Sequence, residues 1–283
     1  MVSGVCQGTL GELYQGPLRA GPEPDIAVVS FPVDRHSWVH FTPGADPPSP
    51  LPLGEKSATA AGLFLRHFGL TLPPGRWSAH SELRVGVGMA SSTADIVATL
   101  RCLFRVFGLP YDLDVVLGIL SAIERSDSVF LDEFALHLSG RHQVVRRLGT
   151  DLGFHTAYVT EPGTVDTTAV TGELVEHYRR RGEEYERCLA ELLKGFASRD
   201  PVVTARAATT SAVLSQAVLP KATFDALLAR RERFGADGVF VAHTGRVIGY
   251  LFRSRPGPDV KADVSAFFRS QGHQCSFVQG GYG

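Results

Sequence analysis

The chain has 283 residues, of which 44% are apolar and 20% charged, and its formal net charge is −1. This is the composition of a globular protein with one large domain or two ordinary ones. The near-zero charge, without a long Lys/Arg run, argues against a nucleic-acid-binding protein, and the apolar runs are too short to span a membrane. We expect no secretory signal, and the four scattered cysteines favour reduced thiols and a cytoplasmic location.

The first half of the chain places strands before helices. Hydrophobic periodicity and turn residues predict strands at Ile26–Phe31 and Ser37–Phe41, an exposed loop at Thr42–Pro52, a helix at Ser57–Phe68, a strand at Trp77–Val87, and helices from Thr93 up to Gly108 and from Val115 to Ile123.

The second half has a different order. Its patterns predict a strand at Gly153–Thr160, helices around Glu173–Ala197, Pro201–Val218 and Phe224–Phe234, strands at Gly238–Ala242 and Val247–Phe252 joined by a turn, a helix at Asp259–Ser270 and a short strand at Gln274–Val278. Strand, helices, hairpin, helix, strand is the order of a ferredoxin-like split β-α-β layer. We therefore predict an α+β fold with helices on one side of mostly antiparallel sheets, divided into residues 1–150 and 151–283.

The stretch GVGMASSTAD, residues 86–95, leads directly into a predicted helix. Free N–H groups and the positive end of the helix dipole make such a turn an anion site. A Walker A loop needs a lysine that this stretch lacks, and a Rossmann loop needs glycine where Ser91 stands. A hydrolase elbow, G-x-S-x-G, is also absent. Two interpretations stay open from the loop alone: the Gly-Leu-Gly-Ser-Ser-Ala phosphate loop of GHMP kinases, or a glycine-serine turn that begins a buried helix.

Other motifs decide between them. In chain order they are GELYQG (11–16), FPVD (31–34), GMASSTADI (88–96), ERSDS (124–128), LPKATF (219–224) and VAHTG (241–245). Over nearly the whole chain this set resembles the L-threonine kinases of cobalamin biosynthesis, a branch of the GHMP kinase superfamily. The resemblance implies a two-lobed fold, with a ribosomal-S5-like N-terminal domain and a ferredoxin-like C-terminal domain. It also implies that ATP and Mg²⁺ lie in the cleft, and that the γ-phosphate passes to the hydroxyl of L-threonine to give O-phospho-L-threonine.

The resemblance assigns nucleotide binding to the loop residues Gly86, Gly88, Met89, Ala90, Ser91, Ser92 and Thr93. Ser92 takes the metal-binding serine position. We assign Glu124 to Mg²⁺ and Asp127 to activation of the acceptor hydroxyl, because two acids three residues apart share a face if the helix continues. The alternative is a solvated helix end that caps itself through Ser126 and Asp127. The family has Pro-Thr between the two acids where this chain has Arg125-Ser126, a difference that bears on acceptor choice.

Five further residues are candidate substrate contacts. Glu12 or Asp34 could pair with an ammonium group, and Gln15 belongs to the same motif as Glu12. His243 and Thr244 lie in the motif whose glycine turn packs near the phosphate loop in this superfamily. For His243, a phosphate contact and a structural hydrogen bond are both open.

Alternative functions follow from the same residues. The acceptor could be another hydroxylated amino acid or related alcohol, such as serine, homoserine or a secondary-metabolite precursor. A catalytically inactive nucleotide-binding regulator and a purely structural scaffold are the alternatives from other classes. The expected partner is a small molecule, with no nucleic acid and no membrane, and a homodimer is possible.

Overall fold

The computed structural model of the protein describes residues 1–18, 25–45, 54–163 and 167–282. Nine strands and eight α-helices, with one short 3₁₀ helix, make up the described chain. In chain order they are β1 (Val2–Leu18), β2 (Asp25–Pro43), α1 (Glu55–Phe68), β3 (Gly75–Ser81), α2 (Ser91–Val106), α3 (Leu113–Ser121), η1 (Ser128–Phe130), β4 (Phe134–Leu138), β5 (Gln143–Gly149), β6 (Gly153–Thr160), α4 (Thr167–Arg180), α5 (Gly182–Ser198), α6 (Pro201–Ser215), α7 (Phe224–Arg230), β7 (Gly238–Val241), β8 (Val247–Phe252), α8 (Pro258–Ser270) and β9 (Ser276–Gly281).

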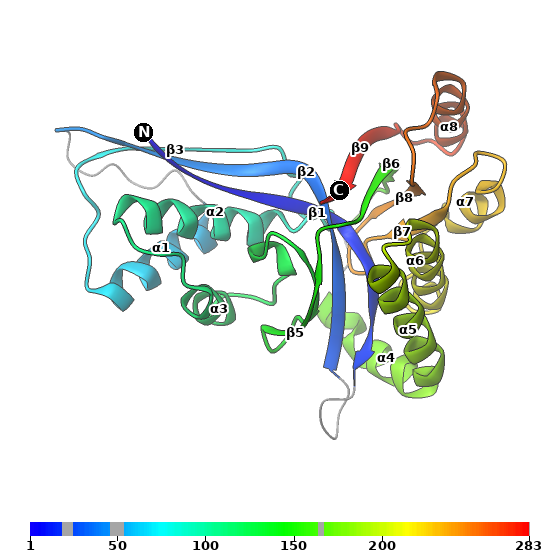
Figure 1. The fold of residues 1–283 in the computed structure, drawn as a ribbon, viewed down its shortest axis with the longest axis horizontal. Helices are drawn as coiled ribbons and strands as arrows, with labels where there is room; N and C mark the ends of the chain where they lie inside the picture. The colour runs from blue at the N-terminus through cyan, green and yellow to red at the C-terminus, as the bar shows by residue number, and fades with distance from the viewer. Residues whose placement is uncertain (19–24, 46–53, 164–166, 283) are drawn as a thin grey trace.

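A long antiparallel ribbon of β1 and β2 runs through the molecule and organises both halves (Figure 1). Helices α1, α2 and α3 lie beside one end of the ribbon, and α4, α5 and α6 lie beside the other. The core is built on this ribbon, because its buried apolar side chains, such as Leu10, Tyr14 and Phe31, belong to the same cluster as those of α2. The mixed α+β content is as predicted.

The last four strands form an antiparallel layer in the order β7-β8-β6-β9. Along the chain, helices follow β6 and β8, which is the split β-α-β order predicted from the sequence. The ribbon joins both edges of the layer, since Glu12 of β1 pairs with Val241 and Val33 of β2 pairs with Gly280. The sheet is therefore continuous across residue 150, and the division of the chain there stays a prediction.

Two predicted elements end earlier than expected, and both changes shape the site. The strand predicted at Trp77–Val87 stops at Ser81, and residues 82–88 wind through turns into the phosphate loop, with positive φ at Gly86 and Gly88. The helix predicted as far as Ile123 stops at Ser121. The helix does not continue to Glu124, so Glu124 and Asp127 do not share a helical face.

The helix predicted at Glu173–Ala197 is two helices, because α4 and α5 meet at Arg181, which has a non-helical conformation. The break lets Tyr185 of α5 turn back onto α4, where its ring packs edge-on against Tyr178 with centroids 5.0 Å apart. Similarly, α7 ends at Arg230, before the predicted Phe234. The loop predicted at Thr42–Pro52 begins only after β2 ends at Pro43, and residues 46–53 lie outside the described residues.

Three strands were not predicted: β1, β4 and β5. β1 is glycine-rich and polar, and its residues 8–17 are buried without alternation, so it lacks the period of a half-buried strand. Gly11 shows why glycine is required there. Its φ is +94°, and a Cβ atom on it would lie 2.3 Å from the Cα atom of Ala242.

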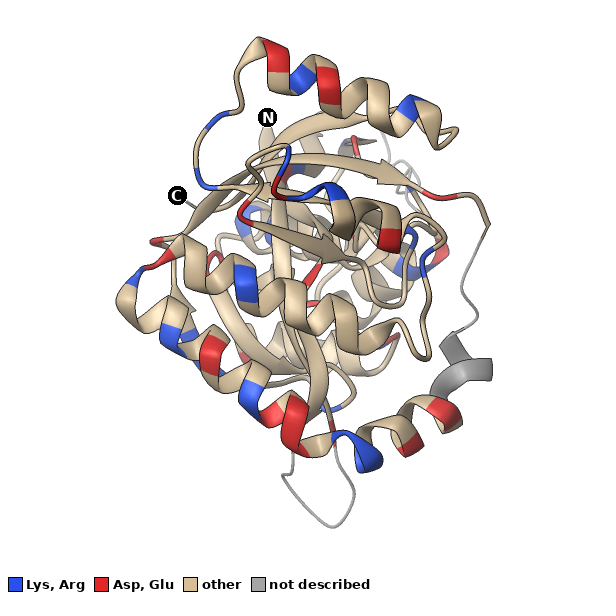
Figure 2. Ribbon diagram, turned by 90° about the vertical axis from the view of Figure 1, so that its right-hand side faces the viewer, with Lys and Arg blue, Asp and Glu red and all other residues tan. Residues whose placement is uncertain are grey.

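The charged residues on the surface are of both signs, in agreement with the formal net charge of −1. On the face shown in Figure 2, basic and acidic residues alternate along the helices. Among the described residues, no helix is both long and apolar enough to cross a membrane. The four cysteines are free thiols, as predicted, and Cys6, Cys102 and Cys188 are buried.

Candidate active site

The helix α2 begins with an open N-terminus. The residue before its first turn, Ala90, has left-handed φ and ψ of 52° and 30°, and within the described residues no side chain caps the first N–H groups. Uncapped N–H groups at the positive end of a 16-residue helix form an anion site. Gly86 and Gly88, with φ of 77° and 89°, bend the chain into this turn. The glycine turn before an open helix start, expected from the sequence, is therefore present, and phosphate binding there stays a prediction.

The turn between β7 and β8 supports this loop from behind. The Arg246 N–H group donates to the Val87 carbonyl at 2.8 Å. A Cβ atom at Gly245 would lie 2.5 Å from the Cα atom of Gly88, so only glycine allows the two turns to pack. On the other side, the Thr9 N–H group donates to the Met89 carbonyl at 3.0 Å. The turn of the VAHTG motif thus packs on the loop, as the resemblance implies.

Glu124 lies directly in front of the first turn of α2. Its carboxylate accepts hydrogen bonds from the Ser92 hydroxyl at 3.0 Å and from the Thr93 hydroxyl at 3.0 Å. The ammonium group of Lys56, in the first turn of α1, donates to the same carboxylate. Lys56 was not among the predicted site residues, because only the fold brings the start of α1 to the loop.

Ser92 and Glu124 fit a magnesium ion of the kind found in kinases. Mg²⁺ takes oxygen ligands, keeps several waters and uses one or two protein groups beside the phosphates of its substrate. One hydroxyl and one carboxylate in hydrogen-bond contact meet this need. In the part of the chain that the structure describes, no cluster of three or more His, Cys, Asp or Glu residues suits a metal ion, so a closed all-protein cage is not formed there.

Asp127 follows Glu124 in an extended loop, with φ −74° and ψ 163°, and its side chain does not cap the following 3₁₀ helix. The Ser30 hydroxyl donates to its carboxylate at 2.9 Å. Loss of hydration raises the Asp127 pKa to about 7, and the carboxylates of Glu12 and Glu124 add to the rise. Ser126 is buried on the His142 ring, 3.0 Å away, rather than at a helix end. The self-capping alternative therefore does not describe this loop.

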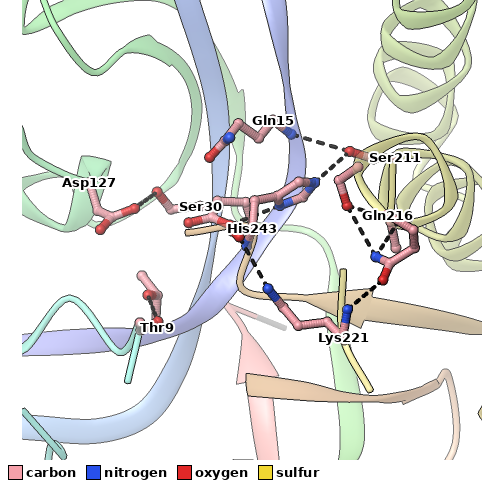
Figure 3. Close-up of polar contacts among 12 residues, drawn as sticks. Thr9, Gln15, Ser30, Asp127, Ser211, Gln216, Lys221 and His243 are labelled. Carbon is pink, nitrogen blue, oxygen red and sulfur yellow. Dashed lines mark hydrogen bonds and ion pairs between the residues drawn. The ribbon is translucent and has the colours of Figure 1, made fainter. Parts of the chain in front are cut away.

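Glu12 reaches the same region from β1, where it pairs with Ser30 of β2. Its Oε2 atom accepts from both the backbone N–H and the Nδ1 atom of His243, each at 2.9 Å. The other ring nitrogen of His243 lies 3.0 Å from the Ser211 hydroxyl, which accepts from the Gln15 N–H group (Figure 3). The Gln15 side chain donates to the Tyr178 hydroxyl at 3.1 Å. His243 therefore makes the structural hydrogen bonds that were one of its two interpretations.

A buried lysine completes this network. The Lys221 ammonium group donates to the His243 carbonyl at 3.2 Å, and burial lowers its pKa to about 8 (Figure 3). Lys221 belongs to the LPKATF motif, yet nothing in that motif indicated a site contact. Ser30 and Ser211 also escaped the sequence analysis, because a lone serine in a strand or a helix carries no signal.

Two predicted substrate residues are not brought into this network. Asp34 is exposed, with 77% of its side chain accessible, and forms an ion pair with His36 at 3.8 Å. Thr244 is partly buried in the turn between β7 and β8. The remaining predicted residues gather in two adjoining groups. The loop group has Ser92, Thr93 and Glu124, and the acceptor group has Glu12, Asp127 and His243 together with Ser30, which was not predicted and donates to Asp127.

Comparison with known proteins agrees with this geometry. Residues 56–135 match the family model "GHMP kinases N terminal domain". The chain is 29% identical to the L-threonine kinase of Citrobacter freundii, over 89% of this chain and 86% of that protein.

Two solved structures share the fold. A mevalonate kinase matches with a TM-score of 0.76 at 10% identity, over the full length of both chains. The homoserine kinase of Cytophaga hutchinsonii matches with a TM-score of 0.68 at 12% identity, over 98% of this chain and 93% of that one. At such low identity these two matches concern the fold alone. The protein therefore carries a GHMP kinase N-terminal domain and is a homologue of L-threonine kinases over most of its length.

Proposed function

We propose that this protein is an ATP-dependent kinase that transfers the γ-phosphate of ATP to the side-chain hydroxyl of L-threonine, giving ADP and O-phospho-L-threonine. The observation that carries the proposal is the pairing of two acids with an open helix N-terminus. Glu124 is bonded to the first turn of α2, and Asp127, with a pKa of about 7, follows it in the same loop. Phosphoryl transfer needs a phosphate cradle, charge neutralisation and a positioned nucleophile.

The nucleotide phosphates would lie on residues 88–93, where the free N–H groups of α2 and the hydroxyls of Ser92 and Thr93 can donate to them. Ser92 and Glu124 would hold Mg²⁺, which in kinases neutralises the charge of the β- and γ-phosphates. The Lys56 side chain is 54% exposed and can turn from Glu124 toward the phosphates. This side of the site therefore concentrates hydrogen-bond donors and positive charge for the nucleotide.

Asp127 would orient the acceptor hydroxyl and accept its proton. A general base works best with a pKa near the working pH, and burial beside two other acids brings this carboxyl to about 7. The transition state of phosphoryl transfer is largely dissociative, so the main role of Asp127 is to align the hydroxyl, and proton removal comes late. The Ser30 hydroxyl holds the carboxylate at 2.9 Å.

Glu12 would pair with the ammonium group of the acceptor. Both contacts from His243 end on its Oε2 atom, so within the described chain its Oε1 atom is available as an acceptor. Glu12 and Asp127 make this side of the site acidic, which suits a cationic amino group beside the reacting hydroxyl. The similarity to an L-threonine kinase over most of the chain supports threonine as the first acceptor to test.

The experiment is ADP release by the purified chain with ATP and Mg²⁺. The acceptors are L-threonine, D-threonine, L-serine, L-homoserine and none, with Asp127→Asn as the matched inactive variant. We expect the fastest release with L-threonine and formation of phosphothreonine in equal amount. Preference for homoserine would show that the acceptor is homoserine, as in the structurally similar homoserine kinase, and not threonine. Nucleotide binding without stimulation by any acceptor would contradict the proposed substrate, and failure to bind nucleotide would contradict the kinase itself.

A further inference from the structure

A cavity of about 340 Å³ borders the phosphate loop, with Met89 of that loop in its lining. It is bounded by β2, by the segment that leads into the loop and by the end of β6. The side chains that matter to the argument are those of Arg35, Glu82, Arg84, Met89, Tyr158 and Thr160. Neither the loop group nor the acceptor group of the proposed kinase site lines this cavity.

A bulge in β2 places Arg35 at this cavity. Val33 pairs with Gly8 and His36 with Gln7, so Asp34 and Arg35 are two residues without a partner in β1. A bulge of this kind redirects side chains. Asp34 is exposed to solvent, whereas Arg35 lines the cavity. The Nε atom of Arg35 is fully buried and has no hydrogen-bond partner among the described residues. A buried unpaired donor on a charged group is unfavourable, so its persistence points to a ligand.

The charges around the cavity are unbalanced. Arg84 is exposed and has no ion-pair or hydrogen-bond partner within the described chain, and both Arg35 and Arg84 line the cavity. Among the described lining residues Glu82 is the only one with a carboxylate, and it accepts a hydrogen bond from the His36 N–H group at 3.1 Å. The hydroxyl-bearing residues Tyr158 and Thr160 add polar groups. Two arginine forks with a net positive lining match the shape and charge of a phosphate or carboxylate group.

We propose that this cavity is a second anion site, which binds a small molecule through a phosphate or carboxylate group held by Arg35 and Arg84. The site is independent of the acceptor of the proposed kinase. It borders the phosphate loop at Met89, which lines the cavity and whose carbonyl accepts from the Thr9 N–H group of β1.

The test is calorimetric titration of the full chain with inorganic phosphate and, separately, with succinate. Both titrations are made first without nucleotide and then with the phosphate loop saturated by a non-hydrolysable ATP analogue and Mg²⁺. The two probes distinguish a phosphate ligand from a carboxylate ligand. We expect one of them to bind, and Arg35→Gln and Arg84→Gln each to weaken that binding about tenfold, since one charge-assisted contact contributes at least about 1.4 kcal/mol. Arg76→Gln, an exposed arginine of β3, is the matched control and should leave binding unchanged.

Three results would overturn the proposal. The first is no binding of either probe, and the second is equal binding to the wild type and to both variants. The third is binding that the ATP analogue abolishes, since that would place the anion on the phosphate loop itself. Arg84 is exposed, so its replacement keeps the test valid if Arg35→Gln does not fold. Failure of the analogue to bind would contradict the kinase instead, and phosphate titration of wild type against Arg84→Gln would still test the cavity.

Discussion

Glu124 and Asp127 stand three residues apart in one loop, but their surroundings differ. Glu124 accepts from two hydroxyls and an ammonium group, so its charge is met by donors. Asp127 accepts from one hydroxyl and is repelled by Glu12 and Glu124, and its pKa rises to about 7. The difference teaches that position in a motif does not set the role of an acid. Under the proposed function, the partners supplied by other elements suit one carboxylate to metal binding and the other to accepting a proton.

Replacing Asp127 by Asn should have the largest effect on activity. We expect turnover to fall about 100-fold or more, because the amide cannot accept the proton, while nucleotide affinity stays unchanged. Steady-state rates and calorimetric binding of an ATP analogue measure the two effects separately. If the variant kept the turnover of the wild type, Asp127 would have no catalytic role, and the proposed difference in role between Asp127 and Glu124 would be wrong.

The same variant should be more stable than the wild type at alkaline pH. A carboxyl with a pKa of about 7 in the folded state and 3.8 in the unfolded state binds its proton more tightly when folded. The stability that it contributes is present at low pH and is lost as pH rises from about 4 to about 7. Between about pH 5 and pH 8, Asp127→Asn should therefore gain about 3 kcal/mol relative to the wild type in urea unfolding. A constant difference across this range would show that the Asp127 pKa is not raised.

Ser92→Ala tests the other side of the comparison. The loss of a metal-binding hydroxyl should weaken magnesium-dependent ATP binding about tenfold, equivalent to about 1.4 kcal/mol. Binding of the ATP analogue at several Mg²⁺ concentrations measures this change. The matched control is Ser121→Ala, at an exposed serine that bonds only to its own helix at Gly118. If the dependence on Mg²⁺ were the same in both variants, Ser92 could not be a ligand.

Glu12→Gln sharpens the electrostatic part of the contrast. Removal of a negative neighbour lowers the pKa of a carboxyl, so the acidic limb of the pH–rate profile should move to lower pH. The wild-type rate should fall as pH drops through about 7, where Asp127 takes up its proton. Glu55→Gln, at an exposed position in α1, is the control for a lost charge elsewhere. If the acidic limb of the pH–rate profile stayed at the same pH, Glu12 would not contribute to the raised pKa of Asp127.

Ala90→Gly should have the smallest effect. Ala90 has a positive φ of 52°, a conformation that disfavours any residue with a Cβ atom by about 1 kcal/mol. Glycine removes this strain but has more freedom in the unfolded chain, so we expect a gain in unfolding free energy of less than about 1 kcal/mol. Ala266→Gly, at an exposed position within α8, should instead destabilise by about 1 kcal/mol. Equal losses in the two variants would show that the turn at Ala90 is not strained.

Much of the fold was predictable, and the failures have a common cause. Helices with a clear apolar period, such as α1 and α2, and the strands of the final layer lie close to where they were predicted. β1 was missed because it is buried over residues 8–17 by neighbours on several sides and shows no alternation. The single helix predicted at Glu173–Ala197 was wrong, because the packing of Tyr178 against Tyr185 favours a break that local periodicity does not encode.

The amino-acid sequence by itself determined the phosphate loop. Its glycines, hydroxyls and helix start are contiguous, and contiguous residues carry their own conformational preferences. Tertiary structure alone decided the acceptor side. Glu12 and His243 are joined across 231 positions, and the Asp127 pKa depends on carboxylates from other segments. Placement of Arg35 at a cavity likewise required the pairing of β2 with β1. Electrostatics and burial arise from groups distant in the chain, so they become visible only once the fold brings those groups together.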